Sequence, residues 1–285
     1  MKHYIRAAGG AVLGLLAMAC GDGGFTPDPG VRTEDAEAVD LENLRILVSG
    51  EARVFPEAEG MASAPASLTG MALTVEEPLR VAVNDAAATF ATGEVSEDGA
   101  FRITGVPVRD VHQGLAVGLS HDGLVRSTTL VYDTAFTGTR PRTDIIDAHA
   151  WALPSAFVDQ LGAAVGAPRL QVHTGDPEAT LASAGFVLGR VVDLNGQPVS
   201  GARVALDRAE LADRVYYPSA DLTSVDTAGT AGTAAHGLFL FVHSGAGVSS
   251  FQVSVEGTSA YVPRNVDVGP GLGVVLTVYP GRYAP

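Results

Sequence analysis

Short runs of β-prone residues, each bounded by glycine, proline or aspartate, recur along most of the chain. In Leu79–Val83, for example, Leu79, Val81 and Val83 alternate with other residues and would share one face of a strand. Runs of this length and spacing are typical of β-sandwiches with about seven strands. The sequence therefore predicts an all-β fold. Further strands are predicted in the first half at Arg45–Ser49, Leu68–Val75, Phe101–Ile103, Leu115–Leu119 and Ser127–Tyr132.

The same pattern returns from Gly185 to the C-terminus. Two runs, Phe186–Asp193 and Ala202–Leu206, flank the dipeptide Asn195-Gly196. This dipeptide favours a type I′ hairpin turn, because such a turn needs positive φ at both central residues. Further strands are predicted at Leu238–Val242, Phe251–Val255 and Val274–Val278.

One segment between the two β-rich regions has a helical period. Phe157, Leu161 and Val165 recur every four residues, and Ser155 is a suitable N-cap. We predict a helix at 155–165 whose apolar stripe packs on a domain, although such a stripe is also compatible with a partner-binding helix. The predicted domains are a first sandwich at 44–143, a linker at 144–184 that contains this helix, and a second sandwich at 185–285.

Charge and cysteine content exclude several classes of function. The chain has 18 basic and 32 acidic residues and a formal net charge of −14. This balance argues against nucleic acid as a partner, because binding it requires basic side chains to neutralise phosphates. Cys20 is the only cysteine, so no disulfide can form within the chain and no cluster of thiolates can bind a metal. We therefore expect the core alone to hold the fold, with no cofactor.

The N-terminus has the layout of a secretory signal peptide at residues 1–19. Lys2 and Arg6 precede an apolar run that ends at Ala19, and this run is shorter than the about 20 residues that span a bilayer. Residues Leu16 to Cys20 resemble the lipobox of bacterial lipoproteins. The resemblance implies cleavage before Cys20 and acylation of its thiol. The alternative is a secreted protein with a chance cysteine.

Acylation of Cys20 would fix the mature chain to a lipid bilayer, because several acyl chains together give stable anchoring. Residues 20–43 are rich in glycine, proline and acids and are predicted to be a flexible tether. Gly21, rather than aspartate, follows Cys20, which by analogy with lipoprotein sorting favours the outer membrane. We therefore expect a membrane-anchored lipoprotein of the bacterial cell envelope.

A regular series of turn and core residues begins in the predicted strand at 186–193. Its members are Gly189, Val191, Asp193, Gly196, Pro198, Gly201, Ala202, Val204 and Leu206. The series resembles the opening of carboxypeptidase regulatory-like domains, a transthyretin-like family with an immunoglobulin-like sandwich. A second hallmark of that family, Gly-x-Phe, fits Gly237 and Phe239, and in the first half Gly99 and Phe101.

This resemblance implies two divergent copies of an immunoglobulin-like, transthyretin-like β-sandwich, joined by the short helical segment. It also implies a structural or binding module rather than a catalytic one. Within the second copy, Val191 and Val204 are expected to face the core from paired strands, and Gly196 to supply the turn.

Several groups of polar residues are candidates for a metal site or a catalytic site. Asp144, Asp147 and His149 have ligand chemistry, but their spacing fits no common metal site, and Asp193 is better explained by a turn than by calcium. We therefore expect no metal. His149, His173 and His243 would support a hydrolase only if the fold brings one of them to a nucleophile and an acid.

Tyr216 and Tyr217 are the possible ligand platform, together with a loop at 226–237 that is predicted to be mobile. The alternative is that these tyrosines are a half-buried strand end. The leading hypothesis is a non-enzymatic surface lipoprotein that binds or scaffolds an extracytoplasmic protein or glycan, with exposed strand edges available to a partner. The alternatives are an accessory subunit that captures a small ligand or glycan for uptake, and a hydrolase.

Overall fold

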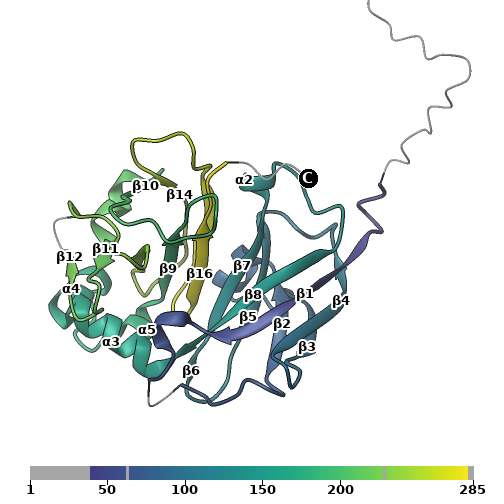
Figure 1. The fold of residues 1–285 in the computed structure, drawn as a ribbon, viewed down its shortest axis with the longest axis horizontal. Helices are drawn as coiled ribbons and strands as arrows, with labels where there is room; N and C mark the ends of the chain where they lie inside the picture. Colours follow the sequence, from purple (N-terminus) through teal and green to yellow (C-terminus); the bar gives the residue numbers. More distant parts are fainter. Residues whose placement is uncertain (1–38, 62–63, 227–228, 282–285) are drawn as a thin grey trace, which may run out of the picture. The chain divides into compact units, whose positions relative to one another are not determined.

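Three β-sheets make up most of the folded body in this computed structural model (Figure 1). The structure describes residues 39–61, 64–226 and 229–281, and a compact unit begins at Val39. The predicted signal peptide at 1–19, Cys20 and most of the predicted tether at 20–43 lie outside the described residues. The all-β class predicted from the sequence is confirmed. No helix in the described ranges has the length and apolar character needed to cross a bilayer.

The largest sheet contains strands from both halves of the sequence. Its nine strands are β2 (Ala72–Glu76), β3 (Thr89–Glu94), β5 (Gly114–Leu119), β7 (Ser127–Asp133), β9 (Phe186–Val191), β11 (Val215–Pro218), β12 (Val225–Asp226), β13 (Leu238–Val242) and β16 (Gly273–Val278). Their order is β12-β11-β13-β9-β16-β7-β5-β2-β3. The C-terminal strand β16 pairs in parallel with β9 on one side and β7 on the other (Figure 1).

A four-stranded sheet packs on the first-half strands of the large sheet. Its strands are β1 (Arg45–Val54), β4 (Ala100–Pro107), β6 (Leu124–Val125) and β8 (Ile145–Pro154), in the order β4-β1-β8-β6. The core between the two sheets includes Val48, Leu73, Phe101, Leu115 and Ala150, all buried. The predicted strands at 45–49, 101–103, 115–119 and 127–132 are confirmed, whereas the strand predicted at 68–75 begins only at Ala72.

The second-half strands of the large sheet are covered on both faces. On one face lies a three-stranded sheet of β10 (Val204–Leu206), β14 (Ser249–Val255) and β15 (Arg264–Val268), in the order β10-β14-β15. Its core with the large sheet includes Val191, Phe239 and Val253. On the other face lie α3 (Ser155–Val165), α4 (Ala167–Thr174) and α5 (Leu181–Ala184).

The predicted helix at 155–165 is confirmed as α3, and its stripe belongs to the core. Phe157, Leu161 and Val165 are fully buried against β9 and β13, which leaves this stripe no role as a docking face. Ser155 is not the N-cap; Pro154 occupies that position, and the Ser155 hydroxyl donates to the Gly123 carbonyl.

Two separate sandwiches at 44–143 and 185–285 are not confirmed. Because β16 lies between β7 and β9, one hydrogen-bonded sheet crosses the proposed boundary. The linker predicted at 144–184 includes β8, which lies within the four-stranded sheet. The halves are also joined through η1 (Pro56–Ala58): Arg190 on β9 forms an ion pair with Glu57 and stacks on the Phe55 ring at 5.0 Å.

One predicted strand is a helix. Residues 79–83 alternate as a strand would, but the structure forms α1 (Pro78–Ala82) there. Pro78 supplies a helical φ at the first turn, and the Glu77 carboxylate accepts a hydrogen bond from the Arg80 amide at 3.1 Å. The Glu-Pro pair was therefore a stronger local signal than the alternation.

The segment that carries the family resemblance makes the predicted turn at Asn195-Gly196, with an antiparallel bridge between Val192 and Pro198, but its predicted return strand pairs elsewhere. Val191 and Val204 share one core, but from opposite sheets, because β9 pairs with β13 and β16 whereas β10 pairs with β14. The turn is not type I′, since Gly196 has φ 74° and Asn195 is not in the positive-φ region. Asp193 holds the turn through its carboxylate, which accepts from the Asn195 and Gln197 amides at 2.8 and 2.9 Å.

Gly189 shows why one position of the series is glycine. A Cβ added there would lie 2.0 Å from Cζ of Phe239 on the neighbouring strand β13. The glycine therefore makes room for the Phe239 ring.

Candidate functional site

Buried charged side chains gather where β15 meets the first half of the chain. Glu77, Asp133, Arg264 and Asp267 have exposed fractions of 1%, 2%, 6% and 2%. Glu77 is the N-cap of α1, and Asp133 ends β7 and is the N-cap of α2 (Thr134–Thr137). We call these four residues the joint, because Arg264 and Asp267 belong to β15 in the other half.

Asp133 is hydrogen-bonded to both halves. One carboxylate oxygen accepts from the Ala135 amide at 2.8 Å and thereby caps α2. The other oxygen accepts from the Asn265 amide on β15 at 3.0 Å, and the Asn265 side chain donates to Asp133 at 3.1 Å. Asp133 thus occupies part of the outer edge of β15, where a neighbouring strand would otherwise pair.

Arg264 is the cation of the joint. Its guanidinium stacks on the Phe136 ring at 3.8 Å, and Nη2 donates to the Thr277 carbonyl at 3.3 Å. Nη1 lies 3.9 Å from an Asp133 oxygen, which makes Asp133 its ion-pair partner. Its Nε is buried and has no partner within the described part of the chain.

The two remaining carboxyl groups differ in their partners. Glu77 accepts from the Arg80 and Gln113 amides, both at 3.1 Å. Asp267 accepts from the Ser250 hydroxyl at 2.5 Å, while its Oδ2 is buried without a partner in the described residues. Burial raises the pKa of Asp267 to about 6, and the nearby charges of Glu77 and Asp133 act in the same direction. The described residues contain no group of three or more ligands that could hold a metal ion.

The joint was missed by sequence reasoning. The available signal was weak: only Val266 and Val268 are apolar within 264–268, and Asp133 directly follows the strand predicted at 127–132. The contacts made by the joint are structural: two helix caps, a strand edge and one ion pair.

Tyr216 and Tyr217 are neighbours in sequence but do not form a platform. Each is only 4% exposed, and they belong to cores on opposite faces of the large sheet. The Tyr216 hydroxyl lies 2.5 Å from Nε2 of His173, and the Tyr217 hydroxyl accepts from the Val204 amide at 2.8 Å. The structure therefore corrects the prediction of a paired aromatic surface.

The loop predicted to be mobile at 226–237 contains a buried anchor. Thr233 is 2% exposed, its hydroxyl donates to the Val199 carbonyl at 2.6 Å, and it accepts from the Ala202 amide at 3.0 Å. These contacts hold the loop to the segment that contains Gly201 and Ala202.

The three histidines considered for catalysis lie in different environments. His243 is fully buried, with Nδ1 3.0 Å from the Ala184 carbonyl, and burial lowers its pKa. His173 contacts Tyr216, and burial lowers its pKa as well. His149 is exposed and stacks on Trp151 at 5.3 Å. Within the described ranges, none of the three forms a hydrogen bond to a serine, threonine or carboxylate that would make a triad.

The acidic segment that precedes His149 serves the fold. The Asp144 carboxylate accepts from the Leu47 amide at 2.8 Å. Asp147 has φ 56° and lies where the register between β1 and β8 shifts, so it belongs to a bulge. Asp144 and Asp147 therefore serve the pairing of β8 with β1.

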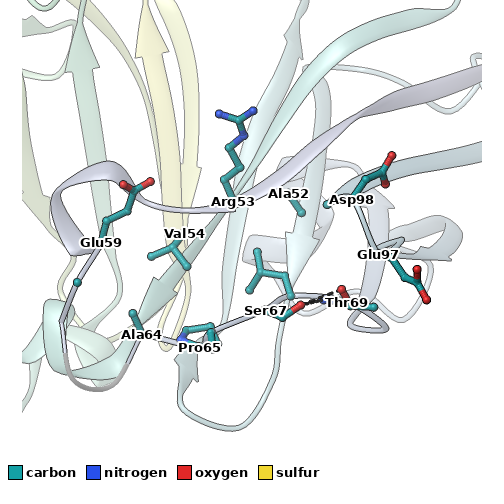
Figure 2. A pocket seen from close by; sticks show the side chains of 14 residues that line it. Ala52, Arg53, Val54, Glu59, Ala64, Pro65, Ser67, Thr69, Glu97 and Asp98 are labelled. Atoms are coloured by element: carbon teal, nitrogen blue, oxygen red, sulfur yellow. Dashed lines mark hydrogen bonds between the residues drawn. The ribbon is translucent and has the colours of Figure 1, made fainter.

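An open surface depression of about 390 Å³ lies beside β1 in the first half. Figure 2 shows Arg53 and Glu59 rising from one side, and Glu97 and Asp98 at the turn on the other. Small side chains lie between them, and Ser67 donates a hydrogen bond to Thr69 at 2.8 Å. The charged groups stand apart around the rim rather than converging on one point, which suits surface binding better than catalysis. The sequence analysis did not identify this depression.

Comparisons with known proteins give no family. No protein-family model matches the chain, and no curated protein matches it. Among solved structures, the shaft pilin SpaA of Lactobacillus rhamnosus GG aligns with TM-score 0.24 and 9% identity over 85% of this chain and 100% of that chain. The Bacillus anthracis TIE protein gives 0.25 and 9% over 85% and 34%, and the Streptococcal ancillary pilin 0.23 and 10% over 84% and 69%. TM-scores of this size assign neither a family nor a function.

Proposed function

We propose that the chain is a lipid-anchored, non-enzymatic protein of the bacterial cell envelope whose folded body binds or scaffolds a partner. The observation that carries this proposal is that histidine and aspartate side chains of the types used in catalysis are bonded to backbone groups of the fold. His243, Asp133, Asp144 and Asp193 each contact backbone groups and hold turns, caps or strand edges. Their chemistry supports the fold, while the leader that ends at Cys20 supports export and anchoring.

The expected partner is an extracytoplasmic protein or glycan. The depression in Figure 2 supports this, because its hydroxyl and carboxylate groups are accessible and its floor is made of small side chains. The alternative role in capturing a small ligand is supported less, since Tyr216 and Tyr217, the side chains expected to form its pocket, are buried.

The anchor is tested by growing cells with an alkyne-labelled fatty acid. We expect label on the wild-type protein and none on Cys20→Ser, which should move from the membrane fraction to the soluble one. An unlabelled wild-type protein that fractionates like Cys20→Ser would refute anchoring and leave secretion as the alternative. We expect an outer-membrane position, which separation of inner and outer membranes on a density gradient tests.

The binding role is tested separately, with the soluble Cys20→Ser protein on an array of cell-surface glycans. We expect binding that is lost in Glu97→Arg/Asp98→Arg at the rim of the depression. The matched control is Glu210→Arg/Asp213→Arg on the helix η2 (Ala209–Arg214), which leaves the rim unchanged. Binding that survives the rim change, or is lost equally in the control, would count against the depression as the site.

A further inference from the structure

The joint contains more acid than base. The joint contains three carboxyl groups, those of Glu77, Asp133 and Asp267, and one guanidinium, whose only ion-pair partner among them is Asp133; all four side chains are at least nine-tenths buried. If every group were ionised, the joint would hold an excess of negative charge away from water. Burying charge without a counter-charge is costly, so a protonated carboxyl group is favoured there.

Of the three carboxyl groups, Asp267 has the fewest hydrogen-bond and ion-pair partners to stabilise its ionised form. Glu77 accepts two backbone hydrogen bonds, and Asp133 accepts three hydrogen bonds and is the ion-pair partner of Arg264. Asp267 accepts only from Ser250, and its second oxygen has no partner in the described structure. The cost of ionisation therefore falls mainly on Asp267.

The charged groups that act on Asp267 from the elements packed against β15 are both acidic, and Arg80, the cation of α1, is directed to Asp85 and the Phe90 ring instead. The N-caps of α1 and α2 contribute Glu77 and Asp133, and β14 contributes the neutral Ser250 hydroxyl. Tyr279, which follows β16, stacks on Arg264 at 5.6 Å rather than supplying a cation. The packing is also close: a Cβ added to Gly269, just after β15, would lie 2.3 Å from the Ala82 carbonyl of α1.

We propose that the joint is a pH-sensitive latch, which is closed while Asp267 carries a proton and loosens when Asp267 ionises, so that β15 separates from α1 as the pH rises. Opening would admit water to the Asp267 carboxylate and remove the cost of its burial. The latch is independent of the proposed anchoring and binding roles.

The direction and size of the effect follow from proton linkage. An exposed aspartate has a pKa of about 3.9, whereas burial in the closed joint raises the pKa of Asp267 to about 6. The closed state therefore keeps a proton that the open state releases between about pH 4 and pH 6. The closed state loses stability as pH rises through that window and stays at the lower level above it. A difference of about two pKa units corresponds to about a hundredfold change in the equilibrium between closed and open states.

Hydrogen–deuterium exchange of the Cys20→Ser protein tests the latch, after correction for the intrinsic pH dependence of exchange. We expect protection of peptides covering 264–268 to fall by about 25-fold from pH 4.5 to pH 7.5, with little change for β9. Asp267→Asn, which cannot ionise, should keep β15 protected at both values. The matched control Asp221→Asn replaces an exposed carboxylate and should behave like the parent protein.

Two results would overturn the proposal: equal β15 protection at both pH values in the parent protein, or the same pH-dependent loss in Asp267→Asn. If Asp267→Asn does not fold, a carbon-13 NMR titration of the parent protein measures the Asp267 carboxyl directly. A pKa above 5 would support the latch, and a lower value would refute it.

Discussion

Tyr217→Phe tests whether the Tyr217 hydroxyl caps β10, the edge strand of the three-stranded sheet. β10 is an edge strand of that sheet, and the Tyr217 hydroxyl accepts a hydrogen bond from the Val204 amide at 2.8 Å in a buried setting. Phenylalanine keeps the ring and its packing but removes this acceptor. The Val204 N–H then stays buried without a partner, which costs about 1–3 kcal/mol.

Tyr216→Phe is the matched control because it changes the adjacent residue in the same way. Its hydroxyl contacts the ring of His173, which is only half-buried, so water can bond to that ring in its place and we expect a loss of about 0.5–1 kcal/mol. Urea denaturation followed by far-UV circular dichroism measures both free energies of unfolding. For a body of this size, about 2 kcal/mol corresponds to a fall in Tm of about 4–8 °C. Equal losses in the two variants, or a loss below about 0.5 kcal/mol for Tyr217→Phe, would refute the assignment of Tyr217 as the cap of β10.

Two further predictions concern the core and its continuity. Gly189→Ala should destabilise the protein by at least ~1–3 kcal/mol, because the new methyl would overlap the Phe239 ring. Adding Phe239→Leu should recover part of that loss in a double-mutant cycle, whereas additive losses would contradict the contact. Val253→Ala on β14 should cost about 2 kcal/mol, from lost burial and the cavity left behind. Trp151, the only tryptophan, lies in β8 of the first half and reports the unfolding of that half by its fluorescence. Because one sheet joins the halves, we expect Val253→Ala to shift the unfolding midpoint from Trp151 fluorescence as far as the midpoint from circular dichroism. An unchanged Trp151 midpoint would show that the halves unfold independently.

Local pattern was enough to predict most individual elements. Short β-prone runs identified β5 and β7, and the four-residue period identified α3 with the bounds that the structure shows. The main local error was at 79–83, where Pro78 and the Glu77 cap make a helix despite the alternation. A capping residue fixes backbone groups directly, whereas alternation only says which side chains would share a face if a strand formed.

Pairing could not be predicted in the same way. Val204 was expected to lie beside Val191, yet β10 pairs with β14 across a long stretch of sequence. Strand pairing is decided by which faces need covering, and apolar runs of similar composition offer several partners. The candidate site shows the same limit, because Asp133 and Asp267 meet only after β15 has been placed against α1 and α2.

The position of β16 explains why the division into two sandwiches fails. Parallel strands are joined by long connections, and β16, the last strand in the sequence, pairs in parallel with β7 of the first half and β9 of the second. The sheet is therefore completed only when both halves are present. Once in place it is buried along most of its length, and its removal would expose the β7 and β9 edges together. At the joint, Arg264 donates to the Thr277 carbonyl of β16, and Asp133 at the end of β7 accepts two hydrogen bonds from Asn265 of β15. The continuous sheet therefore couples the halves through the backbone hydrogen bonds of β16, and the proposed latch at the joint would add a contact between them that depends on the protonation of Asp267.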